Sequence, residues 1–207
     1  MTVEATVRAL RGVLLTVLGC CLLAFGSIST AGFQVLPAPG PPVPFEDSGA
    51  CPFEGCVYRE WTAKAVVSIR AERRRDAPVS FSLQAGEKVT ALTGVVVTLT
   101  PGRVEFRQPK TLSSSPKPIR IEPGQTLYLL TYQGEGFTKA WFNGALYRDV
   151  DASDFLNAVC DFQPDRCMGR VVERWQSEWW VNVRTRSGRL GWTNEPEKFD
   201  GKSAIGG

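Results

Sequence analysis

The sequence predicts an all-β protein built from small barrels of short antiparallel strands, with one short helix. Many runs are short, rich in β-branched residues and bounded by Gly, Pro or charged residues, as strands are. The dipeptides Asn143-Gly144 and Ser187-Gly188 lie between such runs and favour hairpin turns. Many short strands separated by turns are typical of a small barrel or a sandwich.

The strand-like runs are distributed over most of the chain after its first sixty residues. They span 65–70, 79–83, 88–92, 95–99, 104–107, 118–121, 126–132, 139–142, 179–184 and 190–193. A short helix is expected over 154–159, because Ser153 is a favourable N-cap residue.

One turn-and-strand pattern occurs twice. Residues 83–93 (LQAGEKVTALT) align with residues 121–131 (IEPGQTLYLLT), and Gly86 and Gly124 occupy the same place in each. The glycine stands where a turn leads into a new strand. The repeat predicts two related β units within an all-β body at 58–199, with the second unit inserted at about 95–150.

The N-terminus has the pattern of an export signal. Arg8 and Arg11 precede an apolar run at 13–25, and small residues follow up to Ala31. This order is typical of a secretory signal peptide, so we expect residues 1–31 to be removed after Ala31. Two alternatives stay open. The run could be an uncleaved membrane anchor, although it reaches the length of a spanning helix only by counting Ser and Thr. Residues 17–20 (VLGC) also resemble a bacterial lipobox, in which the Cys20 thiol is acylated.

A proline-rich segment separates the N-terminus from the body. Residues 36–44 (LPAPGPPVP) can form neither a helix nor a sheet ladder, because proline lacks the N–H group. The simpler interpretation of residues 32–57 is therefore an extended linker. The alternative is that residues 39–42 dock into an aromatic groove of the same chain, as proline-rich ligands do. Residues 200–207 are expected to form a flexible tail.

The four cysteines outside the expected signal indicate disulfides. Cys51, Cys56, Cys160 and Cys167 allow three pairings in an exported chain. Their close spacing favours the two local pairs, Cys51 with Cys56 and Cys160 with Cys167. Because the spacings differ from the usual zinc-binding C-x2-C, we expect no metal site and no cofactor.

The composition argues against several functions. The formal net charge is only +3, and the basic run at 73–75 is flanked by Glu72 and Asp76, so the clustered cations of a nucleic-acid interface are missing. The chain contains no histidine. This excludes Ser-His-Asp and Cys-His hydrolysis.

Part of the chain resembles the bacterial Src-homology-3-like domain. The resemblance rests on Arg70 after the first strand, Gly86-Glu87-Lys88-Val89 at the central one, Trp180-Val181-Asn182-Val183, and the Gly191-Trp192 ending. The long insertion between the second and third of these elements departs from the family pattern. The resemblance implies a non-catalytic module on the envelope side of a bacterium, which binds cell-wall peptide or glycan, or an envelope protein.

We therefore expect an exported, periplasmic or secreted, binding or scaffolding module with an aromatic binding surface. Trp179 and Trp180 are adjacent, so on a strand they face opposite sides, and both could also be buried between two packed units. A membrane-anchored lipoprotein held through Cys20 is the first alternative. A cell-wall hydrolase using carboxylates near Glu135 and Asp149 is the second. The expected binding residues are Tyr132, Glu135, Trp141, Trp179, Trp180 and Trp192.

Overall fold

The computed structural model of the protein describes residues 39–205. The expected signal peptide, its cleavage site after Ala31 and the candidate lipidation site at Cys20 lie outside the described residues. No helix among the described residues is both long enough and apolar enough to cross a membrane.

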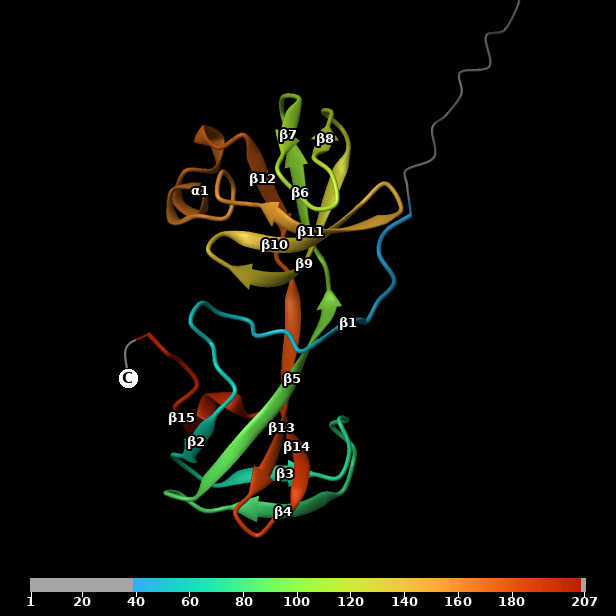
Figure 1. The fold of residues 1–207 in the computed structure, drawn as a ribbon. Coiled ribbons are helices and arrows are strands. Elements are labelled where there is room, and N and C mark those ends of the chain that lie inside the picture. Colours follow the sequence, from blue (N-terminus) through green and yellow to red (C-terminus); the bar gives the residue numbers. More distant parts are fainter. Residues whose placement is uncertain (1–38, 206–207) are drawn as a thin grey trace, which may run out of the picture. The chain divides into compact units, whose positions relative to one another are not determined.

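The described residues form an all-β fold of antiparallel strands, as the sequence predicts (Figure 1). The first sheet has the order β15-β2-β5-β13-β14-β3-β4, and β1 also pairs with β5. Its strands are β1 (Phe45–Ser48), β2 (Glu60–Ala63), β3 (Val67–Arg70), β4 (Val79–Leu83), β5 (Lys88–Thr100), β13 (Gln176–Thr185), β14 (Leu190–Thr193) and β15 (Phe199–Asp200).

The second sheet has the order β11-β10-β9-β6-β12. Its strands are β6 (Gly102–Phe106), β9 (Thr126–Gly134), β10 (Phe137–Phe142), β11 (Ala145–Asp151) and β12 (Gly169–Glu173). A separate hairpin pairs β7 (Lys110–Leu112) with β8 (Ile119–Ile121). Two short 3-10 helices lie at Pro164–Arg166 and Pro196–Lys198.

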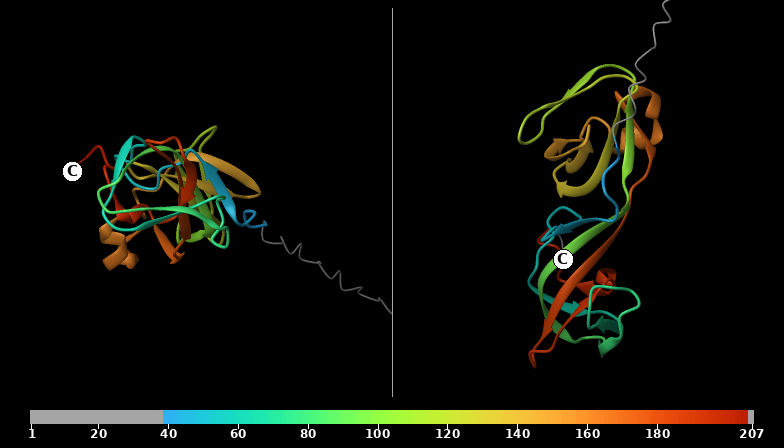
Figure 2. Two further views of the ribbon diagram at one scale, coloured as in Figure 1. Left: turned by 90° about the horizontal axis from the view of Figure 1, so that it is seen from below. Right: turned by 90° about the vertical axis from the view of Figure 1, so that its right-hand side faces the viewer.

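The long strands β5 and β13 enclose the inserted unit. They pair from Thr100 with Gln176 to Val89 with Thr185, and the right-hand view of Figure 2 shows the two long strands running together. The chain between their paired ends forms the second sheet. The strands of that sheet run from Gly102 to Glu173, a longer stretch than the expected 95–150, because β12 returns to β6 before the chain enters β13.

Each sheet has its own apolar core. The core of the first sheet contains Trp61, Ala63, Val67, Ile69, Leu83, Val89, Ala91, Val181, Val183 and Phe199. The core of the second contains Val104, Phe106, Leu112, Ile119, Ile121, Leu127, Leu129, Ala140, Phe142, Val150, Ala152 and Phe155. In short strands such as β3 and β10, residues facing the core alternate with more exposed ones, as the pleat of a strand requires, whereas Gly94 to Thr98 of β5 are all buried.

The sequence divides β5 into two strands at Gly94, but the structure contains one continuous strand. A Cβ atom on Gly94 would overlap the Tyr58 hydroxyl and the Trp179 indole nitrogen, which are hydrogen-bonded to each other over this residue. The glycine therefore provides space for a close approach and does not end the strand. The register of the β5–β13 pairing changes at two other places, between Gln176 and Ser177 and between Asn182 and Val183 of β13, the latter opposite Leu92.

The predicted helix is displaced along the chain. The helix α1 spans Ala158–Phe162, and Asn157 is its N-cap, with a side chain that accepts a hydrogen bond from the Cys160 N–H. Ser153 does not cap it, because its N–H and its hydroxyl both donate to Asp151. The prediction of a helix at 154–159 capped by Ser153 was wrong in position.

The repeated sequence pattern forms the same turn twice. Gly86 and Gly124 both adopt a left-handed backbone, with φ of 86° and 85°. In each copy the side chain of the residue after the glycine, Glu87 or Gln125, accepts a hydrogen bond from the N–H of the residue three positions earlier. The two turns lead into β5 and β9, each an interior strand of its sheet.

Both expected flexible ends contact the body within the described range. Strand β1 begins inside the expected linker and pairs with Val95 to Thr98 of β5. In the expected tail, Ala204 donates its N–H to the Gly55 carbonyl, and Ser203 forms a β-bridge with Cys56. These backbone pairings follow from the fold and not from propensity, because neither segment has a strand-like composition.

Both local disulfides are confirmed. Cys51 is bonded to Cys56 and Cys160 to Cys167. Two disulfides are consistent with an extracytoplasmic protein.

Candidate functional site

The outer face of β10 organises the candidate site. Along this strand Phe137, Lys139 and Trp141 are half-buried, and they alternate with three buried residues that face the core. The N-terminal segment contacts this face at two points. The Trp141 indole N–H donates to the Pro39 carbonyl at 3.0 Å, and Lys139 forms an ion pair with Asp47. The remaining residue, Phe137, lines a pocket.

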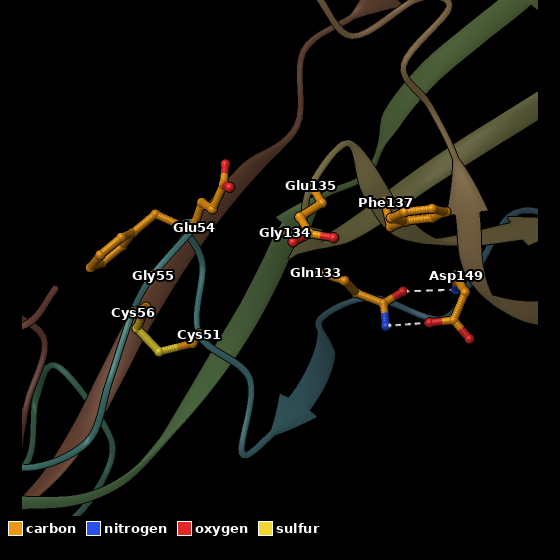
Figure 3. Close-up of a pocket in the computed structure, with 10 residues that line it drawn as sticks. Cys51, Glu54, Gly55, Cys56, Gln133, Gly134, Glu135, Phe137 and Asp149 are labelled. Carbon is orange, nitrogen blue, oxygen red and sulfur yellow. Dashed lines mark hydrogen bonds between the residues drawn. A yellow bond between two sulfur atoms is a disulfide. The ribbon is translucent and has the colours of Figure 1, made fainter. Parts of the chain in front are cut away.

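This pocket has a volume of about 550 Å³ and lies between the Cys51–Cys56 loop and the β9–β10 hairpin (Figure 3). Figure 3 shows the disulfide loop on one side and the hairpin residues with Asp149 on the other. The lining residues are Cys51, Phe53, Glu54, Gly55, Cys56, Gln133, Gly134, Glu135, Phe137 and Asp149. The pocket thus joins a loop near the start of the body to a hairpin and strand that are far from it in the sequence.

The hairpin wall has an unusual backbone. Glu135 and Asp149 are two of the few non-glycine residues with positive φ, at 52° and 50°. Asp149 is fixed by a reciprocal pair of hydrogen bonds with Gln133, whose side chain donates to the carboxylate and accepts from the Asp149 N–H. A left-handed backbone at a non-glycine residue costs roughly 1–2 kcal/mol, so the surrounding contacts must hold these residues in place.

The loop wall is supported by aromatic packing. Phe53 packs edge-on against Trp179, with ring centroids 5.7 Å apart. Trp179 donates its indole N–H to the Tyr58 hydroxyl, which in turn donates to the Ala50 carbonyl. Burial raises the pKa of Tyr58, although the hydrogen bond from Trp179 acts in the opposite direction. The disulfide loop is therefore held by its own bond and by the core of the first sheet.

The pocket is acidic and partly aromatic. Its lining includes the carboxylates of Glu54, Glu135 and Asp149, and it includes no Lys or Arg. None of these three carboxylates forms an ion pair within the described residues. Phe53 and Phe137 add apolar surface and π-faces. Carboxylates next to aromatic rings favour a positively charged group that carries some apolar surface.

The structure does not assemble the predicted aromatic residues into one surface. Trp141 contacts the N-terminal segment, and Tyr132 accepts a hydrogen bond from the Gly136 N–H. Trp179 supports the disulfide loop. Trp180 is only 2% exposed and packs with Val95 and Val97, so its assignment as a surface binding residue is corrected. Alternation along β13 places Trp180 on the face opposite Val181 and Val183, where it is buried in a separate small cluster.

Trp192 is covered by the loop between β3 and β4. The Arg73 guanidinium lies 6.0 Å from the centre of the Trp192 ring and also pairs with Glu46. Arg75 of the same loop pairs with Glu178. The basic run is therefore neutralised by acidic partners, and it closes over Trp192.

Of the predicted binding residues, only Glu135 lines the pocket, together with the cysteines of the first disulfide. Its place between two glycines was its signal in the sequence, and Asp149, which the sequence offered only as a carboxylate of the alternative hydrolase, lines the same pocket. Phe53, Glu54, Gln133 and Phe137 were missed, because nothing in their local sequence shows that the disulfide loop meets the hairpin. Among the described residues, no group of three or more His, Cys, Asp or Glu side chains could hold a metal ion.

Comparison with protein-family models, with curated proteins and with solved structures finds no match to this chain. The resemblance to Src-homology-3-like domains therefore stays a prediction.

Proposed function

We propose that the protein is a non-catalytic, exported binding module that captures a positively charged group of a peptide in the pocket beside the Cys51–Cys56 loop. The observation that carries the proposal is a pocket lined by two phenylalanine rings and by three carboxylates that have no cationic partner in the part of the chain the structure describes. Cell-wall peptides and envelope proteins both offer such groups, as free amines or as Lys and Arg side chains.

Electrostatics and shape support a binding role. The three carboxylates lie on different segments, so a ligand that enters the pocket contacts acidic groups of both walls. Such groups attract a cation over several ångströms, and the attraction falls with ionic strength. A cation over an aromatic face gains about 0.5–1 kcal/mol at an exposed site. A ligand with a flexible amine and an aliphatic stem would satisfy both kinds of lining.

Binding requires less of this pocket than catalysis would. Hydrolysis of a glycosidic bond needs two carboxylates at a fixed separation, one of them protonated at neutral pH. Binding an amine needs only negative charge and apolar contact, which the lining supplies. We therefore favour a binding module over the carboxylate-based hydrolase.

Co-sedimentation with purified cell-wall sacculi tests the proposal. We expect the protein to pellet with sacculi at low salt and less so at high salt. Glu54→Gln, Glu135→Gln and Asp149→Asn should each weaken pelleting, because each removes one carboxylate from the pocket. Glu72→Gln removes the same charge from the β3–β4 loop and is the matched control, which should pellet like the unmodified protein.

Chemical acetylation of the sacculi provides a control on the ligand side, since it neutralises free amines. If acetylated sacculi bind as well as untreated ones, recognition of an amine is ruled out. Soluble sugar or peptide fragments in the supernatant, lost in Glu135→Gln, would instead favour the hydrolase.

A further inference from the structure

The protein has a second candidate binding surface, which is separate from the acidic pocket. It consists of Tyr128 on β9 and Trp141 on β10, and we refer to it as the Tyr128–Trp141 face. The two residues are direct cross-strand partners in the second sheet. Directly opposite residues of an antiparallel pair project to the same side, so the two rings form one aromatic surface.

This face contacts the proline-rich segment. The Trp141 indole N–H donates to the Pro39 carbonyl, and Gly40 lies over the Tyr128 ring, so that a Cβ atom at Gly40 would stand 3.6 Å from it. Proline-rich chains have no internal hydrogen bonds, and their carbonyls need outside donors. Trp141 supplies such a donor, and Tyr128 supplies a flat apolar surface.

The segment is also fixed at its other end. Asp47 pairs with Lys139, two residues before Trp141 on β10, and β1 pairs with β5. The anchor at Asp47 follows Pro39 closely in the chain, and it therefore keeps Pro39 near Trp141. A short tether of this kind gives an effective concentration on the order of millimolar, so even a weak contact stays formed within one chain.

We propose that the Tyr128–Trp141 face is a recognition surface for proline-rich peptides, and that the chain fills this surface with its own residues 39–42. Residues 39–42 thus act as a ligand that is covalently attached to its own binding surface. A free peptide of the same sequence occupies the same surface when the segment in cis is weakened. The extended, preformed conformation of such peptides reduces the entropy lost on docking.

The test uses the full chain with Pro39, Pro41 and Pro42 replaced by Ser, and a fluorescent peptide LPAPGPPVP as the probe. Fluorescence anisotropy should show that the peptide binds the substituted chain about tenfold or more tightly than the unmodified chain, because the competitor in cis is lost. A peptide with Ser in place of every Pro should not bind. Adding Trp141→Phe to the substituted chain should weaken binding again, since Phe keeps the apolar ring but lacks the N–H donor.

Two further measurements make the result decisive. In the proton–nitrogen spectrum, the indole signal that disappears in Trp141→Phe should shift in the Ser-substituted chain and return towards its original position when peptide is added. Gly40→Ala, whose new Cβ atom would only touch Tyr128, should leave that signal nearly unchanged. Equal peptide binding to both chains, or no binding to a substituted chain that keeps its circular dichroism spectrum, would overturn the proposal.

Discussion

Lys139 on β10 donates from its ammonium group to both carboxylate oxygens of Asp47 on β1, at 2.6 and 2.7 Å. The two strands belong to different sheets, so this ion pair joins the sheets directly. The side chain of Asp47 is only 8% exposed and that of Lys139 is 19% exposed. The pair lies between the Trp141 contact and the acidic pocket on the outer face of β10.

The first prediction concerns this pair. Lys139→Met leaves the Asp47 carboxylate buried without its cation, and we expect a loss of about 3 kcal/mol in the free energy of unfolding. Asp47→Ala should cost less, because the longer Lys139 side chain can reach water. Urea denaturation of both variants and of the double variant measures the coupling. Single losses that simply add in the double variant would show that the pair does not stabilise the fold.

The second prediction concerns the space at Gly94. Gly94→Ala would push a methyl group into the hydrogen-bonded Tyr58 and Trp179 side chains, and overpacking of this kind costs about 1–3 kcal/mol. Thermal denaturation should show a lower midpoint for the variant. Because the Tyr58 hydroxyl is one of the two groups in the way, Tyr58→Phe added to Gly94→Ala should cost less than the sum of the single variants. Full additivity would contradict the predicted overlap.

The third prediction concerns the two disulfides. Replacing Cys51 and Cys56 by Ala removes a short closed loop, for which the chain-entropy relation gives about 2 kcal/mol of lost stability. The same change should weaken binding to sacculi, because this loop is one wall of the pocket. Replacing Cys160 and Cys167 is the matched control, and it should lower stability by a similar amount without affecting binding. Loss of binding in both variants would point to general unfolding.

The fourth prediction concerns the backbone at Glu135. Glu135→Asn should raise the stability by up to about 1 kcal/mol, because Asn tolerates the left-handed backbone better than Glu does. It should also weaken ligand capture, since it removes a pocket carboxylate. Urea denaturation and co-sedimentation on the same preparation measure the two effects. A stability gain with unchanged binding would remove Glu135 from the proposed site.

The fifth prediction concerns acid stability through Glu195. Burial alone raises the pKa of Glu195, but hydrogen bonds from Lys198 and the Ser68 N–H, with nearby positive charge, outweigh it and leave the pKa below its ordinary value. A carboxyl whose pKa is lower in the folded state contributes stability above the pKa of the unfolded chain, and this is lost as the pH falls through the folded pKa. Stability should therefore decrease as the pH falls below about 4.

Glu195→Gln should make the urea midpoint less sensitive to pH in that range. The exposed neighbour Glu197 offers the control, and Glu197→Gln should keep the acid sensitivity of the unmodified protein. An unchanged pH profile in Glu195→Gln would show that this carboxyl does not contribute to acid unfolding.

Local features of the fold could be predicted from the sequence because interactions between residues close together in the chain determine them. Strands β4 and β14 were predicted with their observed bounds, since each is a short run enclosed by turn residues. The turns at Gly86 and Gly124 could be predicted because only glycine adopts their backbone without strain. The close spacing of the cysteines favoured the two local disulfides over a pairing between the ends.

Features that depend on distant partners could not be predicted in this way. Strand β1 has the sequence FEDS after a run of prolines, and it becomes a strand only because β5 and Lys139 are placed beside it. In the sequence Gly94 indicates the end of a strand. In the structure it leaves space for the Tyr58 and Trp179 side chains, which are hydrogen-bonded to each other next to it.

The sequence by itself determined the all-β class, the hairpin turns, the repeated glycine turn and the cysteine pairs. Each of these follows from residues close together in the chain, whose conformational preferences act before any long-range contact forms. Only the tertiary structure decided that Trp180 is buried, that Pro39 meets Trp141, and that Glu54 and Glu135 line one pocket. Those contacts join residues far apart in the sequence, and they exist because long-range strand pairing and burial of the two cores bring the segments together.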